Sequence, residues 1–316
     1  MLYKNSIKIL FSNFNIVWKS IIYYLLSFVA CIGLIFLCLN PVYKILDNSG
    51  FWTMIVDSYT NFLSSLDLNQ LMEMVNYLID KFWEVMVANI SQFWFSFISV
   101  AVVGLFFATI IANLTIMPSC NTLHYYMGSM NKHGFWSSFN ETFWKSLKVQ
   151  LVHFLISIPI NAVNVVLLIL GIKLFSSYWL LSIFAGFLIV LEIVLLVAFK
   201  YSLLVNWIPT MVIMNYGVFK SLKVSIKNTF RNFARIFSSS IGVVLTIIII
   251  NVVFGLFTFM AGLLISVPAS YLLYSTFGMV STYENQGMRY YVDVCNVVTP
   301  KKRERTDKLA DMKYIV

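Results

Sequence analysis

The stretch SIKILFSNF at residues 6–14 returns as SIKNTFRNF at residues 225–233, with six of the nine residues identical. In both places a basic, aromatic and amphipathic stretch leads directly into a long apolar segment. This arrangement predicts a duplicated unit, in which a helix on the membrane surface precedes a helix that spans the membrane. The repeat indicates the architecture and the orientation of the chain, and it does not indicate a substrate.

The composition points to a chain surrounded by lipid. Of its 316 residues, 60% are hydrophobic and only 11% are charged, whereas a soluble domain of this size carries about 25% charged residues. So few charges cannot cover a surface exposed to water. The apolar runs are long and continuous, unlike the short alternating segments of a membrane barrel. We therefore predict an all-α, polytopic helical bundle in a membrane.

Six apolar segments are each close to the ~20 residues that cross the hydrocarbon core. We predict a single transmembrane domain over residues 1–284, with a helical insertion outside the membrane at 41–91 and a basic tail at 285–316. The predicted spans are at about 17–40, 92–117, 149–172, 178–203, 238–258 and 260–284.

The basic residues predict the orientation. They gather before the first span, after the second, after the fourth and in the tail, whereas the insertion at 41–91 has six acidic residues and two basic ones. Because cytoplasmic loops are enriched in Lys and Arg, this places both termini in the cytoplasm and the protein in the cytoplasmic membrane. The net charge of +9 then serves topology and contact with anionic lipid headgroups. No nucleic-acid-binding module accompanies it.

The repeated stretch predicts surface helices. Apolar residues of segment 217–237 recur at spacings of three and four, which puts them on one helical face. A row of cations runs beside them, Lys223, Lys227, Arg231 and Arg235, and the N-terminal copy carries Lys4 and Lys8. A weaker third copy covers residues 135–148. The prediction is three units, each a cytoplasmic interfacial helix followed by a transmembrane hairpin, with the cations facing lipid headgroups.

Short turns separate these units. Spans two and four end near Pro118 and Pro209, and asparagine-to-glycine turns follow at residues 131–134, 215–217 and, after span six, 285–287. Glycine tolerates a positive φ and ends a helix sharply. We expect the three glycines to provide that conformation.

The insertion at 41–91 contains two amphipathic patterns. One runs from Phe51 to Leu66, and the other, from Leu68 to Val85, has Asp67 as its expected N-cap. Two helices could lie over the bundle or along the outer lipid surface. They would serve either as a packed structural cap or as a recognition surface for a protein partner or substrate.

The region around residues 205–240 resembles a known group of proteins. Pro209, the turn at 215–217, the helix from Ser221 to Lys227 and Asn232 are similar to a pattern in bacterial six-helix integral membrane proteins. That group includes the membrane domain of some glycerophosphoryl diester phosphodiesterases. Its helix reads A-x-x-x-S-x-x-x-x-x-x-N, and Ser221 here replaces the alanine. The resemblance implies a six-helix fold and an association with envelope lipid metabolism. The catalytic domain of those enzymes has no counterpart in this chain.

Polar residues inside the predicted spans are the candidates for chemistry. Counting 1.5 Å per residue from the cytoplasmic ends puts four of them near one midplane layer: Glu192, Asn161, Asn164 and Asn251. An ionised carboxylate at that depth costs several kcal/mol unless it is paired or beside water. The layer is either a polar site for a proton-coupled or cation-dependent substrate, or a set of hydrogen bonds that hold the helices together.

The sequence predicts no metal site and no cofactor. None of its four cysteines forms a CxxC pair, and no nucleotide-binding or hydrolase motif is present. We therefore expect a non-enzymatic membrane protein that handles a lipid-like or amphipathic substrate, as a transport or envelope accessory component. The alternative is an assembly partner of another membrane complex, acting through 41–91 and the basic tail. An intramembrane lipid enzyme with Glu192 as its acid or base is a third reading.

Overall fold

The computed structural model describes residues 2–65, 68–178, 181, 183–293 and 295–300. Over these residues the chain consists of helices, the two short antiparallel strands β1 (Tyr290–Asp293) and β2 (Asn296–Val298), and the turns that connect them. Six helical segments among them are long and apolar enough to cross a membrane. The prediction of an all-α protein with six spans is thereby confirmed. Asp67 and the basic tail from residue 301 lie outside the described residues.

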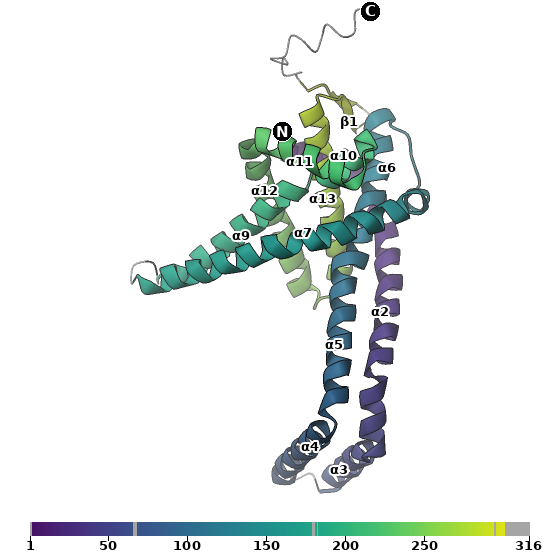
Figure 1. The fold of residues 1–316 in the computed structure, drawn as a ribbon, viewed down its shortest axis with the longest axis vertical. Helices are drawn as coiled ribbons and strands as arrows, with labels where there is room; N and C mark the ends of the chain where they lie inside the picture. The colour runs from purple at the N-terminus through teal and green to yellow at the C-terminus, as the bar shows by residue number, and fades with distance from the viewer. Residues whose placement is uncertain (1, 66–67, 179–180, 182, 294, 301–316) are drawn as a thin grey trace, which may run out of the picture. The chain divides into compact units, whose positions relative to one another are not determined.

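The helices form two compact units, which we describe separately (Figure 1). The smaller unit, Tyr24–Ala112, holds most of α2 (Asn15–Asn48), α3 (Phe51–Ser65), α4 (Leu68–Ala88) and α5 (Ile90–Phe106). The larger unit joins the residues up to Tyr23 to those from Asn113 onward. It contains α1 (Leu2–Ser12), α6 (Ile116–Ser129), α7 (Phe135–Ser177), α9 (Ala185–Leu204), α10 (Trp207–Met214), α11 (Val218–Arg231), α12 (Phe233–Phe257) and α13 (Leu263–Gln286).

The repeated stretches form helices that break at the same position. Asn13 separates α1 from α2, and Asn232, its equivalent, separates α11 from α12. The third copy is different, because its surface segment and the following span form one continuous helix, α7. Aligning SFNETFWKS at residues 138–146 with the other two copies puts Lys145 where they have asparagine. Asparagine bonds readily to nearby backbone and favours helix ends, so its absence accounts for the continuous helix.

The side of these helices that faces the protein interior carries serine. Ser6, Ser138 and Ser225 occupy the same position of the three copies, and each is completely buried. Small side chains let two helix backbones approach closely, and α7 and α11 pack here against α6 and α10. Phe219 and Phe230, on the predicted lipid-facing side of α11, are 73% and 62% exposed. Their contact with lipid stays a prediction.

Two prolines break spans two and four without ending them. Pro118 and Pro209 each stand third in a short helix, α6 and α10, where a missing N–H is tolerated. Ahead of α6 the chain passes through π and 3₁₀ turns at Phe107–Ile111 and Ala112–Thr115, and ahead of α10 through a turn at residues 205–206. Each span therefore continues past its proline as a second, short helix.

The carbonyl groups deprived of a helical donor by these prolines are covered from other helices. Pro118 leaves the carbonyl of Leu114, which accepts a 3.1 Å hydrogen bond from Ser146 Oγ on α7. Pro209 leaves the carbonyl of Val205, against which α13 packs so closely that a Cβ added to Gly278 would lie 2.5 Å from the oxygen. Non-helical backbone is tolerated at membrane depth only when it is covered in this way.

The turns that follow α6, α10 and α13 correct one expectation about glycine. Gly134 and Gly217 are N-caps in extended conformation, with φ of −71° and −68°. The left-handed conformation that ends the preceding helices belongs to Met130 and Asn215 instead, with φ of 58° and 50°. Only Gly287, at the end of α13, has the positive φ that we expected of all three. Gly134 and Gly217 therefore begin the following helices as N-caps and do not end the preceding ones.

The core of the larger unit surrounds the second half of α13. Almost every residue from Leu272 to Tyr283 is buried there, in contact with α1, α6, α10 and α12 (Figure 1). Beyond this core Glu284 forms an ion pair with Arg235 and accepts a 2.9 Å hydrogen bond from the hydroxyl of Tyr290. Burial, and then Glu284, raises the pKa of Tyr290, so its hydroxyl keeps the proton that it donates. These groups mark a polar layer at one end of the unit.

Gly278→Ala should destabilise the protein by about 1–3 kcal/mol, because the new methyl group would force α13 away from the Val205 carbonyl and Pro209. Thermal unfolding in a mild detergent measures this. Gly33→Ala in α2 is the matched control, since nothing lies within 4 Å of the Cβ that it would add. Equal melting temperatures for the two variants would contradict the close packing of α13 on the proline break.

Candidate functional site

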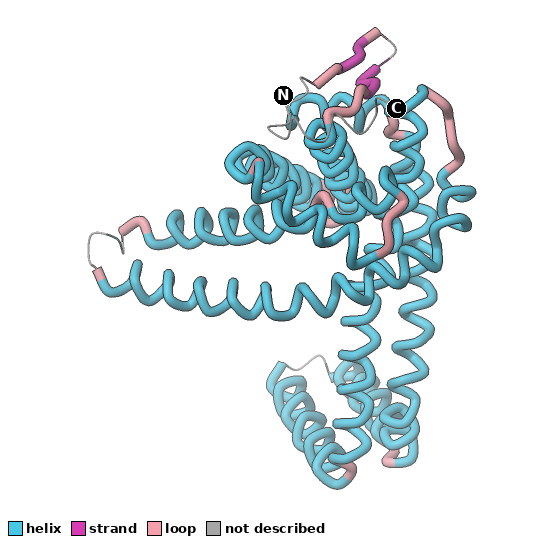
Figure 2. Tube along the Cα trace, turned by 45° about the horizontal axis from the view of Figure 1, so that its top comes forward, coloured by secondary structure: helices cyan, strands magenta, loops and turns pink. Residues whose placement is uncertain are grey.

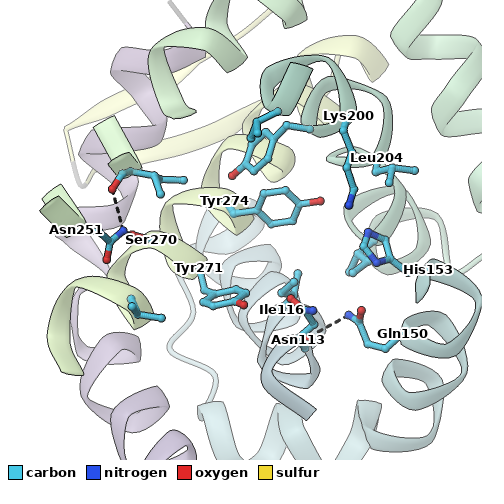
Figure 3. A pocket seen from close by; sticks show the side chains of 15 residues that line it. Asn113, Ile116, Gln150, His153, Lys200, Leu204, Asn251, Ser270, Tyr271 and Tyr274 are labelled. Carbon is cyan, nitrogen blue, oxygen red and sulfur yellow. Dashed lines mark hydrogen bonds between the residues drawn. The ribbon is translucent and has the colours of Figure 1, made fainter. Parts of the chain in front are cut away.

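A cavity of about 410 Å³ lies inside the larger unit, at the level of the two proline breaks (Figure 3). Asn113 and Ile116 line it from the first break, and Leu204 and Ile208 from the second. The remaining walls belong to α7, α9, α12 and α13. Its volume falls in the range of small-molecule sites, about 300–1,000 Å³. The breaks therefore provide an internal space as well as a change of helix direction.

One side of this cavity is polar. Gln150 and His153 reach it from α7 and Lys200 from α9, and Figure 3 shows the Lys200 amine beside the His153 ring. Gln150 Nε2 donates to the carbonyl of Asn113 at 2.9 Å. Lys200 Nζ donates to Asn161 Oδ1 at 2.8 Å. The polar side is thus built from the antiparallel helices α7 and α9, which run beside each other in Figures 1 and 2.

Two buried polar atoms at the cavity lack a hydrogen-bond partner among the described residues. They are the hydroxyl oxygen of Tyr201 and Oε1 of Gln150. A buried polar group left unpaired costs about 1–3 kcal/mol, so native proteins pair nearly all of them. Both atoms belong to residues that line the cavity.

The rest of the lining is aromatic and aliphatic. Tyr201 and Tyr274 meet edge to face with ring centroids 4.4 Å apart, and Tyr271 lies one turn before Tyr274 on α13. The aliphatic members come from α6, α9, α10, α12 and α13: Ile116, Val197, Leu204, Ile208, Ile247 and Val267. A cavity with one polar side and apolar walls matches a molecule with a polar end and an apolar body.

The cavity is deep relative to the polar layer at Arg235 and Glu284. Tyr274 precedes Glu284 by ten residues of α13, and Asn251 follows Arg235 by sixteen residues of α12. At 1.5 Å per residue these separations are about 15 and 24 Å. If the charged layer lies at the headgroups, the cavity lies near the middle of a hydrocarbon core about 30 Å thick.

Two of the four predicted midplane residues lie at this cavity. Asn251 lines it, and its side chain donates to Ser270 Oγ at 2.9 Å and accepts from Ser266 Oγ at 2.8 Å, which ties α12 to α13. Asn161 reaches it through the hydrogen bond from Lys200. Asn251 therefore acts as an interhelical bond, and Asn161 holds a cation in place.

The structure does not bring Glu192 and Asn164 into the same site. The carboxylate of Glu192 rests on Gly171 of α7, where an added Cβ would meet Oε2 at 1.9 Å. Gly171 lies ten residues, about 15 Å, beyond Asn161 along α7. Asn164 lies one turn beyond Asn161 and does not line the cavity. The single polar layer is wrong in this respect, because the long α7–α9 hairpin puts Glu192 well beyond the level of Lys200.

The sequence did not reveal most of the charged, polar and aromatic residues that line the cavity. Lys200 and Glu192 are the only charged residues of the candidate span from Ala185 to Met214, so a cation at that position was a detectable signal. His153 lines the cavity as well. Tyr271 and Tyr274 looked like ordinary aromatic residues of a span. Their grouping depends on how six helices pack, which periodicity does not encode.

No protein-family model matches the chain, and neither a curated protein nor a solved structure is similar to it. The resemblance to the membrane domain of glycerophosphoryl diester phosphodiesterases therefore stays a prediction.

Asn251→Ala should lower stability by about 0.6–1.7 kcal/mol, the range of interhelical hydrogen bonds in membranes, because Ser266 and Ser270 lose their shared partner. Thermal unfolding in detergent measures the loss. Asn164→Ala is the control, since Asn164 has no side-chain hydrogen bond among the described residues. If Asn251→Ala melts with the wild type, its role in joining α12 to α13 is wrong.

Proposed function

We propose that this chain is a non-enzymatic protein of the cytoplasmic membrane that binds a lipid-like or amphipathic substrate in the cavity between α7, α9, α12 and α13. It would act as a transport or envelope accessory component. The observation that supports this most is the cavity itself, with polar groups on one side and tyrosine and aliphatic side chains elsewhere. A soluble polar substrate would leave those apolar walls without contact.

The depth of the cavity also favours an amphipathic ligand. A molecule that reaches this level of a membrane protein must either cross the hydrocarbon core or come from it. Acyl chains already occupy the core, so a lipid has the shorter path. Residues beside both proline breaks line the site, as in membrane transporters whose discontinuous helices form binding sites.

The proposed orientation agrees with the grouping of the ends of the helices. Asn5 of α1 donates to the Tyr290 hydroxyl at 2.9 Å, and Lys145 donates to Asn215 Oδ1 at 3.3 Å. Asn232 donates to Asn285 Oδ1 at 2.9 Å. The N-terminal helix, the turns at residues 131–134 and 215–217 and the end of α13 therefore lie at one end of the larger unit. This is the end that carries Lys4, Lys8, Lys223 and Lys227, so we assign it to the cytoplasm and to anionic headgroups.

Val267→Trp should reduce the amount of lipid that remains bound to the purified protein, because the indole would occupy the cavity that Val267 lines. Quantitative mass spectrometry of lipid per protein, after purification in a mild detergent, measures this. Leu264→Trp is the matched control, since Leu264 lies on the same helix but is 55% exposed. Equal lipid content in both variants and the wild type would overturn the proposed function.

A further inference from the structure

Lys200 is an isolated cation at the cavity. It lies on α9 next to Tyr201, whose ring packs on Tyr274 of α13. Tyr274 is about 15 Å along α13 from Glu284, which forms the ion pair with Arg235. Neither Asp nor Glu is among the residues that line the cavity. In the described part of the chain, no carboxylate lies within 4.0 Å of Lys200 Nζ. The Lys200 ammonium group therefore has no counter-charge from the protein around it.

The contacts of Lys200 leave it able to bind an anion. A lysine ammonium group has three N–H donors, and Asn161 Oδ1 accepts one of them at 2.8 Å. A lysine cation in the hydrocarbon region costs several kcal/mol, and such residues pair with an opposite charge or face a cavity. Here the amine points into the cavity beside His153.

We propose that the polar end of the bound amphiphile is anionic, a carboxylate or a phosphate, and that it pairs with Lys200. This inference rests on the proposed function, since it names the substrate class of the same cavity. The anion accepts a hydrogen bond from Lys200 Nζ, and the apolar body lies along the aliphatic walls. Lys200 is then a binding residue and not a surface anchor.

Two pairs of probes test the anionic group, each pair differing in that group alone. Dioleoyl phosphatidic acid is compared with dioleoylglycerol, and oleate with oleyl alcohol, by the shift in melting temperature on titration into purified protein. We expect the anionic member of one pair to bind more tightly. The pair that responds identifies phosphate or carboxylate. In Lys200→Gln the affinity for that anion should fall about ten- to hundredfold, and the neutral member should bind as before.

The controls separate this inference from the proposed function. Lys173→Gln removes an exposed cation of α7 and should keep the preference for the anion. Lys200→Arg keeps the charge and should also retain it. Val267→Trp should weaken all four probes. If Val267→Trp does so but the wild type binds anionic and neutral members equally, or Lys200→Gln keeps the preference, the anionic assignment fails while the lipid site stands. If Val267→Trp changes nothing, both fail.

A second inference comes from α3 and α4 of the smaller unit. The two helices are antiparallel, because Phe51 at the start of α3 packs on Phe82 near the end of α4, with ring centroids 5.8 Å apart. Figures 1 and 2 show them side by side. Between them and the adjoining ends of α2 and α5 lies a small core of Leu46, Phe51, Val85 and Phe93. We refer to α3 and α4 together as the α3–α4 hairpin.

Each helix of the α3–α4 hairpin has a second apolar stripe on its exposed surface, and Trp52 at the start of the α3 stripe also contacts Tyr43 of α2, with ring centroids 5.8 Å apart. The members of a stripe are four apart or three apart, so each stripe follows one line along its helix. All eight side chains are exposed: Trp52, Val56, Tyr59 and Leu63 in α3, and Met72, Val75, Ile79 and Trp83 in α4. For example, Val56 and Ile79 are each 59% exposed.

The two stripes lie on the same side of the hairpin. An α-helix turns by about 100° per residue. In each helix the exposed stripe follows the packed residues by one position, so it lies about 100° clockwise from the packed side when the helix is viewed from its N-terminus. Antiparallel helices with equal offsets present their stripes in the same direction. Four exposed carboxylates lie roughly 230° around from the packed side, which is the other face: Asp57, Glu73, Asp80 and Glu84. The hairpin therefore has one apolar face and one acidic face.

We propose that the apolar face of the α3–α4 hairpin lies on the outer surface of the lipid bilayer. The connections to the apolar helices are short: two residues separate α2 from α3, and Asn89 alone separates α4 from α5. The hairpin is therefore held at the ends of two candidate spans. A helix pair with aromatic and aliphatic residues on one face and charges on the other is suited to a membrane interface.

Single cysteines test this placement in phosphatidylcholine nanodiscs, with the four native cysteines replaced by alanine. Val56→Cys and Ile79→Cys are on the apolar face, and Asn61→Cys and Glu73→Cys on the acidic side are the matched exposed controls. A membrane-impermeant maleimide should label the apolar pair several-fold more slowly. Similar rates on both faces would overturn the proposal. Disulfide-linked dimers of Ile79→Cys would also overturn it, and would assign the face to a second copy of the chain.

Discussion

The backbone carbonyls that Pro118 and Pro209 leave without a helical donor constrain much of this structure. In lipid an unpaired backbone group costs several kcal/mol, so each break must be covered by another helix. Ser146 donates to the carbonyl of Leu114, and α13 packs on that of Val205 through Gly278. These contacts place α7 and α13 against the breaks, and with them the residues that line the cavity between.

The cavity and its charge follow from this arrangement. Helices that bend at a break cannot fill all the space beside it with their own side chains, and residues of both breaks line the cavity. Lys200 lies on α9 four residues before Leu204, which borders the second break. Glu192, two turns further from the break, rests on Gly171 instead. A carboxylate that looked like the best candidate for chemistry is thus held by close helix packing, whereas a cation at a break faces internal space.

In the three related surface segments, one sequence pattern supplies both a face that packs inside the protein and a face that is exposed. The serines at equivalent positions, Ser6, Ser138 and Ser225, are buried against neighbouring helices, and the phenylalanines and cations of α11 are exposed. A hydrophobic pattern alone suggests that the aromatic face is the buried one in a soluble protein. In this chain the small polar face is inside, because helices pack closely in lipid through small residues and gain little from burying apolar ones.

The sequence by itself determined the class of protein, the six candidate spans and the repeat. Composition, the length of apolar runs and the positions of proline and asparagine are local properties of the sequence. In a bilayer an apolar run of sufficient length forms a helix, because the helix pairs its own backbone groups. The tertiary structure decided which polar residues meet. Asn161 and Asn251 reach one cavity and Glu192 does not, because the register of α7 against α9 depends on Gly171 and on packing at the breaks. It also decided that the exposed stripes of α3 and α4 share one face, since that depends on two helices being antiparallel, and no single helical period contains this information.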